Sequence, residues 1–125
     1  MTNYFKWKSD FLTGNSKVDG QHQYLFKLAN HLQESEVSEC RTVIMELYRY
    51  TRVHFSAEEE LMSLSKYPLL KDHIKLHENL ITILNDLSSQ FEETTESRDD
   101  LVAFFGNWIV NHILNEDLRF ANFIE

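Results

Sequence analysis

Hydrophobic side chains recur at every third or fourth position along most of the chain, which is the period of an amphipathic α-helix. Four such segments follow one another, and the pattern predicts helices at about 19–33, 39–64, 69–92 and from 97 to at least 112. Asp19 and Ser38 are expected to cap the first two helices, and Ser97 with Asp100 has the spacing of a capping box. Pro68 follows the second helix, which it cannot continue.

The same pattern predicts which side chains face the core. The first helix would turn inward His22, Leu25, Phe26, Ala29 and Leu32, and the third helix Leu76, Leu80, Ile83, Leu84 and Leu87. Short polar links between the four segments place consecutive helices antiparallel. We therefore predict an all-α fold, an up-down antiparallel four-helix bundle. Three glycines and one proline are too few for turn-rich sandwiches or barrels.

The first 18 residues differ from the rest of the chain, because they carry large apolar side chains without a helical period. These side chains are Tyr4, Phe5, Trp7, Phe11 and Leu12. Aromatic residues this dense are seldom left in water, so we expect an ordered N-terminal arm lying across the bundle rather than a flexible tail. The whole chain, 1–125, is then one domain: an arm at 1–18 and a bundle at 19–125.

Composition narrows the range of partners. Hydrophobic residues make up 42% of the 125 residues and charged residues 26%, with a net charge of −8 and no cluster of Lys or Arg. We therefore expect neither nucleic acid nor an anionic membrane as a partner. The single cysteine, Cys40, cannot form an internal disulfide, which fits a reducing compartment. With no secretory signal and no apolar run of spanning length, we expect a cytoplasmic protein without direct membrane contact.

Histidines and acids recur at a spacing typical of metal ligands. His54 with Glu58, and His73 with His77, stand four residues apart, so each pair projects from one face of a helix. His22 lies early in the first predicted helix and His112 late in the fourth. In an up-down bundle all these positions fall at one end, within about 10 Å along the axis. A lone buried histidine is more often bonded to a carbonyl group, but several imidazoles and carboxylates buried together indicate a metal site.

Helical spacing also assigns His31 and the acid that follows His112. His31 follows His22 by nine residues, about 180° around a helix, so we expect it at the surface. Glu116 lies four residues after His112 and fits an ideal helix, whereas Asp117 lies about 140° away from His112. Spacing alone therefore favours Glu116 as the second acid of the site. Glu59 is expected to face away from it.

These motifs match a known family. The runs Val18-Asp19-Gly20-Gln21-His22 and His54-Phe55-Ser56-Ala57-Glu58-Glu59, the pair His73 and His77, and the run from His112 to Asp117 resemble the hemerythrins in their bacterial form, the bacteriohemerythrins. The resemblance implies two iron ions joined by an oxo or hydroxo bridge. It assigns one iron to His73, His77 and His112, the other iron to His22 and His54, and both irons to Glu58 and Asp117.

This assignment has two structural consequences. It replaces Glu116 by Asp117, so the fourth helix should widen between His112 and Asp117, as a turn of the π kind. It also gives one iron six ligands and the other five, which leaves one position open for a small ligand. Phe55, Trp108 and Leu114 match the apolar walls of the family's oxygen pocket, although ordinary core packing would account for them as well.

The resemblance implies reversible O₂ binding, with azide, nitric oxide and peroxide as further ligands. The protein would store or deliver oxygen, or serve as the oxygen- or redox-sensing input of a signalling protein with a covalently linked C-terminal output domain. The helical pattern of residues 118–124 hints at the latter. A di-iron enzyme that reduces nitric oxide or peroxide is the alternative, but no proton donor or electron-entrance motif stands out. Structural zinc takes four ligands rather than seven.

Overall fold

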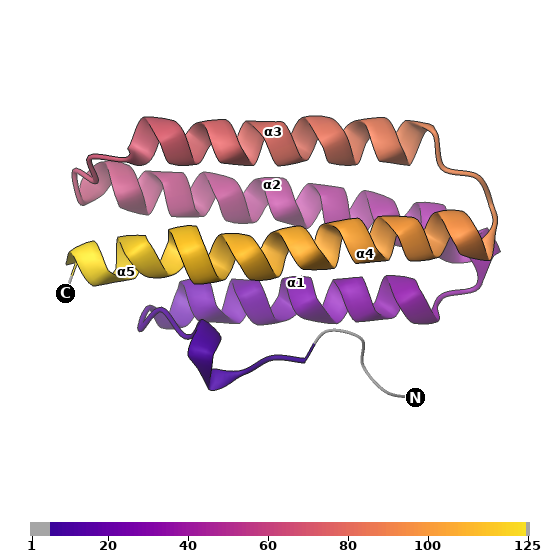
Figure 1. Cartoon of the computed structure of the whole chain (residues 1–125), viewed down its shortest axis with the longest axis horizontal. Coiled ribbons are helices and arrows are strands. Elements are labelled where there is room, and N and C mark those ends of the chain that lie inside the picture. The colour runs from indigo at the N-terminus through magenta and orange to yellow at the C-terminus, as the bar shows by residue number, and fades with distance from the viewer. Residues whose placement is uncertain (1–5, 125) are drawn as a thin grey trace.

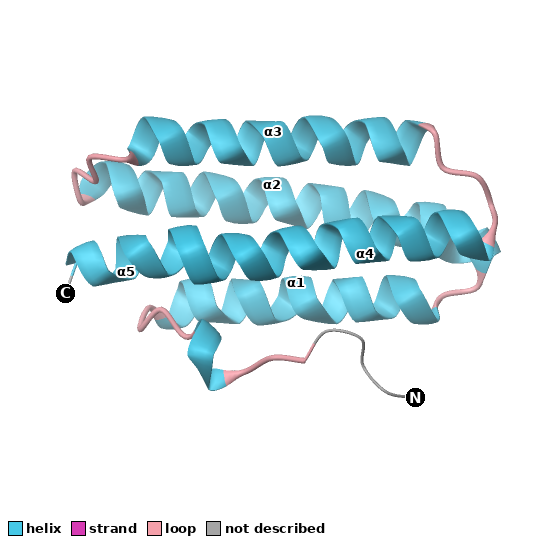
Figure 2. Cartoon of the chain, viewed as in Figure 1, coloured by secondary structure: helices cyan, strands magenta, loops and turns pink. Residues whose placement is uncertain are grey.

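Four long helices lie side by side and antiparallel in the computed structural model, which describes residues 6–124 (Figure 1). The helices are α1 (Ser16–Glu34), α2 (Cys40–Leu64), α3 (Leu70–Ser89) and α4 (Thr95–His112). A π-helical turn, η3 (Ile113–Asp117), continues α4 into α5 (Leu118–Ile124), and the three form one rod. No strand occurs in the described range (Figure 2). The predicted all-α four-helix bundle is confirmed.

The first helix begins three residues earlier than predicted, at Ser16. Asn15 is its N-cap, because the Asn15 side chain accepts a hydrogen bond of 3.0 Å from the backbone N–H of Val18. The prediction of Asp19 as the cap is wrong for a physical reason. The carboxylate of Asp19 points back to the preceding loop, where it accepts hydrogen bonds from Thr13 and Gly14. The arm therefore ends before residue 16.

The other helix boundaries shift by a few residues. Ser38 does not cap α2; it lies inside a short 3-10 turn, η2 (Val37–Glu39), that leads into the helix. The N-cap of α4 is Thr94, whose hydroxyl accepts a 3.1 Å bond from the N–H of Ser97, so the predicted capping box is wrong. The third helix ends at Ser89, and Phe91, just beyond it, is buried in the core.

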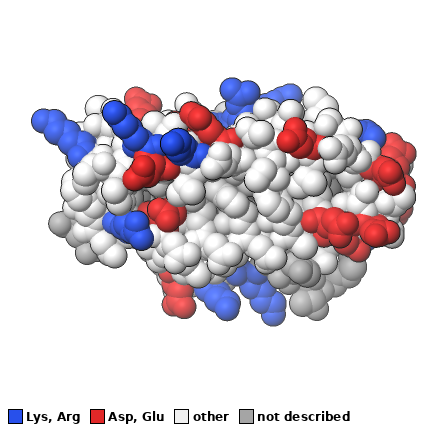
Figure 3. Space-filling model, turned by 45° about the horizontal axis from the view of Figure 1, so that its top comes forward, with Lys and Arg blue, Asp and Glu red and all other residues white. Residues whose placement is uncertain are grey.

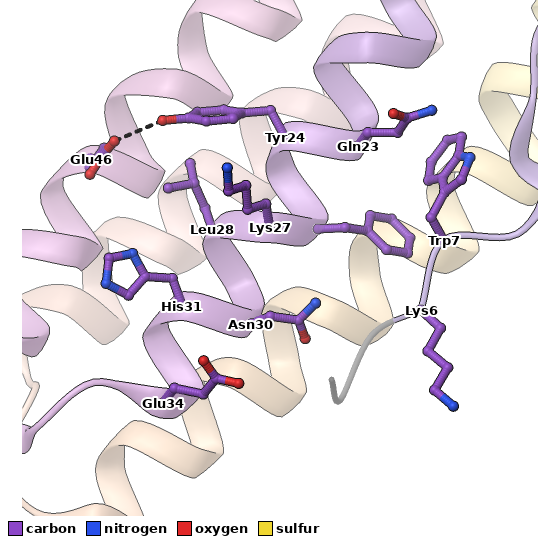
Figure 4. A pocket seen from close by; sticks show the side chains of 11 residues that line it. Lys6, Trp7, Gln23, Tyr24, Lys27, Leu28, Asn30, His31, Glu34 and Glu46 are labelled. Carbon is purple, nitrogen blue, oxygen red and sulfur yellow. Dashed lines mark hydrogen bonds between the residues drawn. The ribbon is translucent and has the colours of Figure 1, made fainter. Parts of the chain in front are cut away.

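The described part of the arm packs on α1 and includes a short 3-10 turn, η1 (Ser9–Phe11). The rings of Trp7 and Phe11 lie 5.3 Å and 5.4 Å from the ring of Phe26. These contacts confirm that the arm is ordered at Trp7 and Phe11, whereas Tyr4 and Phe5 lie outside the described range. A groove of about 1120 Å³ runs beside Trp7 and along α1, and Tyr24 donates a hydrogen bond to Glu46 on its far side (Figure 4). None of the predicted ligands lines this groove.

The bundle has two apolar clusters, and the predicted ligands lie between them. The larger cluster fills most of the bundle and includes Leu25, Leu47 and Phe105. The smaller one consists of Met62, Tyr67 and Phe120 and closes the end beyond the ligands. The predicted inward face of α1 is buried as expected, and His31 is exposed. On α3, Leu80 and Leu84 are buried and Leu76 and Leu87 are half-buried, whereas the inward prediction for Ile83 is wrong, because this side chain lies at the edge of the buried stripe and is 42% exposed.

Surface charges of both signs are interspersed on the face shown in Figure 3, without a continuous basic strip. Among the described residues, no helix has both the length and the apolar character needed to span a bilayer. The absence of nucleic-acid and membrane partners stays a prediction.

Candidate metal centre

The seven predicted ligands meet at one end of the bundle. They form two overlapping groups of donor atoms that lie within 4.8 Å of one another. The first group is Glu58, His73, His77, His112 and Asp117, and the second is His22, His54, Glu58 and Asp117. All seven side chains are buried, with at most 5% of any one exposed. Two acids thus belong to both groups, as expected of bridging ligands.

Regular helices explain most of this convergence, and one irregular turn explains the rest. His54 with Glu58 on α2, and His73 with His77 on α3, face inward as pairs one helical turn apart. After His112 the chain forms the π-helical turn that the resemblance implied, and Asp117 becomes 2% exposed. The side chain of Glu116 is 28% exposed and lies 3.9 Å from Arg119. The choice of Glu116 by spacing is therefore wrong, since spacing assumed a regular α-helix.

The donor atoms have the spacing of positions around one ion. The Nε2 atom of His112 lies 3.1 Å from the Nε2 atoms of both His73 and His77. Asp117 Oδ2 lies 3.1 Å from His22 Nε2, and Glu58 Oε1 lies 2.8 Å from His73 Nε2. Neighbouring donors about 2.1 Å from an octahedral ion lie about 3.0 Å apart. The side chains are thus arranged to share cations rather than only to bond one another.

Several of these atoms lack a hydrogen-bond partner. They are His22 Nε2, Glu58 Oε2 and both carboxylate oxygens of Asp117, all fully buried. A buried polar atom without a partner costs free energy, and buried carboxylates cost most. A metal ion bound by these oxygen and nitrogen atoms removes that cost. The donor set therefore fits a pair of transition-metal ions, and the mixture of imidazole and carboxylate suits iron.

The electrostatics of the cluster also favour cations. Burial alone would raise the pKa of Glu58, but hydrogen bonds from the surrounding histidines hold it well below its ordinary value. The pKa of Asp117 is lowered as well, against burial and the nearby charge of Glu58, chiefly by the charge of nearby His112. Burial would lower the pKa of His22 and of His73, yet the two acids raise both to about 9. The carboxylates are thus ionised, and metal ions would displace the histidine protons.

Two ligands are held by polar side chains that the sequence did not indicate. Gln21 Oε1 lies 2.6 Å from Nδ1 of His54, and Glu59 Oε2 lies 2.7 Å from Nδ1 of His77. Each bond leaves Nε2 directed at the cluster and fixes the orientation of the ring. The prediction that Glu59 faces away is wrong, because its side chain reaches across to α3. Its position directly after Glu58 was the only available signal.

Aromatic rings cover two of the histidines. The ring of Phe55 stacks on His77 with a centroid distance of 3.6 Å and an angle of 2°. The ring of Trp108 stacks on His112 at 4.4 Å and 13°. Leu114, the third predicted wall, is 41% exposed, while Ile113 is fully buried, so the Leu114 prediction is wrong. A residue two positions beyond an inward ligand points to the opposite side of a helix.

A four-helix bundle that buries five histidines around two shared acids defines a dinuclear metal-binding protein. The model of the hemerythrin HHE cation binding domain matches residues 13–124. Bacteriohemerythrin of Pseudomonas aeruginosa is 32% identical over 120 residues, which cover 93% of this chain and 78% of the relative. Myohemerythrin of Riftia pachyptila is 28% identical over 116 residues, with 93% and 90% covered. Bacteriohemerythrin of Clostridium acetobutylicum is 27% identical, with 94% and 99% covered. The chain belongs to the hemerythrin family.

Membership fixes the general chemistry of the site. Hemerythrins bind O₂ at a di-iron centre and are not enzymes. The buried cluster supplies the histidine, glutamate and aspartate donors that such a centre needs.

Proposed function

We propose that the chain binds O₂ reversibly at a di-iron centre held by the seven buried ligands. The single observation that carries this proposal is that Glu58 and Asp117 belong to both donor groups. His73, His77 and His112 would hold one iron, and His22 and His54 the other. When bound, the iron pair supplies the electrons and the coordination position that O₂ needs.

The two donor groups are unequal, and this inequality supports small-ligand binding. Three histidines with the two shared acids and a bridging oxygen would saturate an octahedral ion, whereas two histidines with the same bridges would leave one position open. The iron held by His22 and His54 would therefore be the one that takes a small ligand. Azide, nitric oxide and peroxide are expected to compete for it.

The surroundings favour binding over reduction of nitric oxide or peroxide. The ring centroids of Phe55 and Trp108 lie 5.8 Å apart. These two apolar rings stack on His77 and His112 and shield them from water. Apart from the seven ligands, the buried polar side chains among the described residues are Asp19, Ser35 and Thr51. The Asp19 carboxylate is bonded to the loop at 13–14, and Ser35 and Thr51 carry alcohols. The Cys40 thiol and the Tyr67 hydroxyl are on buried residues too, and burial raises the pKa of both, which makes them poorer acids. These residues offer no general acid to a bound ligand.

Storage or delivery of oxygen is the use that we propose first. The sensing input of a larger protein is a second use, favoured by the exposed apolar side chains of Phe123 (46%) and Ile124 (44%) on α5, which an output domain could cover. Cytoplasmic location stays a prediction as well.

Spectroscopy with metal analysis tests the proposal. Purified protein should contain two irons per chain, and the colourless ferrous form should gain a visible band in air and lose it under argon. Asp117→Ala and His54→Ala should lose iron and the band, whereas Glu116→Ala should keep both. A chain without iron, or iron bound equally well by the Asp117→Ala variant, would refute the site. Immediate irreversible oxidation in air would refute reversible binding.

A further inference from the structure

A small cavity lies against the two shared acids, at the end of the bundle. It has a volume of about 10 Å³, which is room for at most one water molecule. Buried Glu58 and Asp117 form its inner end, and half-buried Thr13 and Asn15 form its outer end. Its side walls are apolar and include Val18, Leu61 and Phe120. The aromatic rings that cover His77 and His112 do not line it.

A depression on the surface lies next to the cavity. This depression, of about 280 Å³, lies between α1 and α2 and shares Asn15, Val18 and Leu61 with the cavity. Its rim carries the polar side chains of Gln21 and Glu60, with Lys17 beside them. Asn15, Val18 and Leu61 therefore stand between the depression and the cavity, and movement of these side chains would open a path from solvent to the shared acids.

The inner end of this path suits a cation. Glu58 Oε2 and the oxygens of Asp117 are buried there without hydrogen-bond partners, so they attract positive charge in a medium of low dielectric constant. Neutral O₂ gains nothing from a carboxylate, and an anion such as azide is repelled. Carboxylate oxygens also readily replace the water molecules around a hydrated divalent ion.

One side of the path is the 13–15 loop, which is bonded to the start of α1 through Asn15 at its end and through the carboxylate of Asp19 along its length. Asp19 Oδ1 accepts hydrogen bonds from the N–H (2.8 Å) and the hydroxyl (2.7 Å) of Thr13, and Oδ2 accepts one from the N–H of Gly14 (3.3 Å). Gly14 has a φ of 92°, a conformation that favours glycine. The opposite side, α5, continues directly from Asp117 and is packed through Phe120, whose ring lies 4.9 Å from that of Tyr67. The loop is therefore the side that can move.

We propose that this path is the route by which iron enters and leaves the centre, and that Asp19 keeps the 13–15 loop closed over it. A hydrated ferrous ion is far larger than the cavity, so the ion passes only when the loop opens. The inference rests on the proposed di-iron site and adds a route and a gate to it.

Release of iron to a chelator measures the opening of the loop. Iron-loaded ferrous protein is mixed under argon with excess bipyridine, and the coloured iron complex is followed in time. Asp19→Asn should release iron about tenfold faster than wild type, since an amide cannot accept all three hydrogen bonds. Thr13→Val, which loses one of them, should give a smaller acceleration. Asp10→Asn removes the same charge from the exposed part of the arm and should release iron at the wild-type rate.

Three further readouts separate opening of the loop from global unfolding and from a change at the iron itself. Release through the loop should not change in low urea, whereas release by global unfolding accelerates with urea. The rate of azide binding to the oxidised protein should be the same in Asp19→Asn and wild type. The proposal would be overturned by any of three results. These are release of iron from Asp19→Asn at the wild-type rate, iron release that depends on urea, and azide binding that becomes faster while iron release does not. A wild-type chain without iron would instead refute the di-iron site itself.

Discussion

Removal of the Glu59 carboxylate should weaken iron binding without touching any proposed ligand. Glu59 Oε2 lies 2.7 Å from Nδ1 of His77, and its side chain is 28% exposed. A hydrogen bond to a charged group contributes roughly 1.5–3 kcal/mol, and partial exposure places this bond near the lower limit. A loss of about 1.5 kcal/mol corresponds to roughly tenfold weaker binding. We therefore expect Glu59→Ala to lower iron affinity by about tenfold and Glu59→Gln, which keeps an acceptor, by less.

Equilibrium competition with a chelator of known iron affinity measures this effect. Glu60→Gln is the matched control, because Glu60 is the next residue on α2, carries the same charge and is exposed. Its affinity should remain within about twofold of wild type, as expected of an exposed charge. The thermal stability of the metal-depleted variants should also be compared, so that loss of fold is not mistaken for loss of affinity.

An iron affinity of Glu59→Ala equal to that of wild type would show that the ring of His77 is oriented by packing alone. The stacked ring of Phe55 is the obvious alternative support. An equal loss in Glu59→Ala and Glu60→Gln would attribute the effect to net charge rather than to the hydrogen bond. Either result would refute the reasoning.

Three further predictions follow from single features of the structure. The hydroxyl of Thr51 is buried without a partner, so Thr51→Val should raise the free energy of unfolding by about 1 kcal/mol in urea titrations; a fall would reveal a hidden partner. Gly14→Ala should lower the free energy of unfolding by about 1 kcal/mol. A Cβ at this position would meet no atom within 4 Å, so the cost comes from the φ of 92°, which strains an alanine backbone; unchanged stability would refute the strain. In metal-depleted protein the pKa values of His22 and His73 are raised from 6.5 to about 9, so their protons stabilise the fold fully below pH 6.5. That stability, on the order of a few kcal/mol, should be lost as the pH rises through 9, while iron-loaded protein should show a flatter pH profile; identical profiles would contradict this.

The hydrophobic period predicted the four helices because burial of one apolar stripe is a property of each segment by itself. The same holds for the pairs of His54 with Glu58 and His73 with His77, whose spacing depends only on helix geometry. The ends of the helices were harder to predict. Aspartate is a common N-cap residue, but the carboxylate of Asp19 accepts hydrogen bonds from the preceding loop, and Asn15 is the N-cap of α1.

The site shows the same division between sequence and structure. Sequence determined which histidines could meet, since their heights in an up-down bundle follow from residue number. Helical spacing favoured Glu116 and the resemblance of the motifs pointed to Asp117; the tertiary structure brings Asp117 to the site, because a π-helical turn shifts the angular position of every residue after His112. The outward position of Leu114 could have been predicted from spacing, because Leu114 stands two positions beyond His112. The tertiary structure also decided that Glu59 bonds His77. That contact depends on where a neighbouring helix lies, and spacing along a single helix does not contain that information.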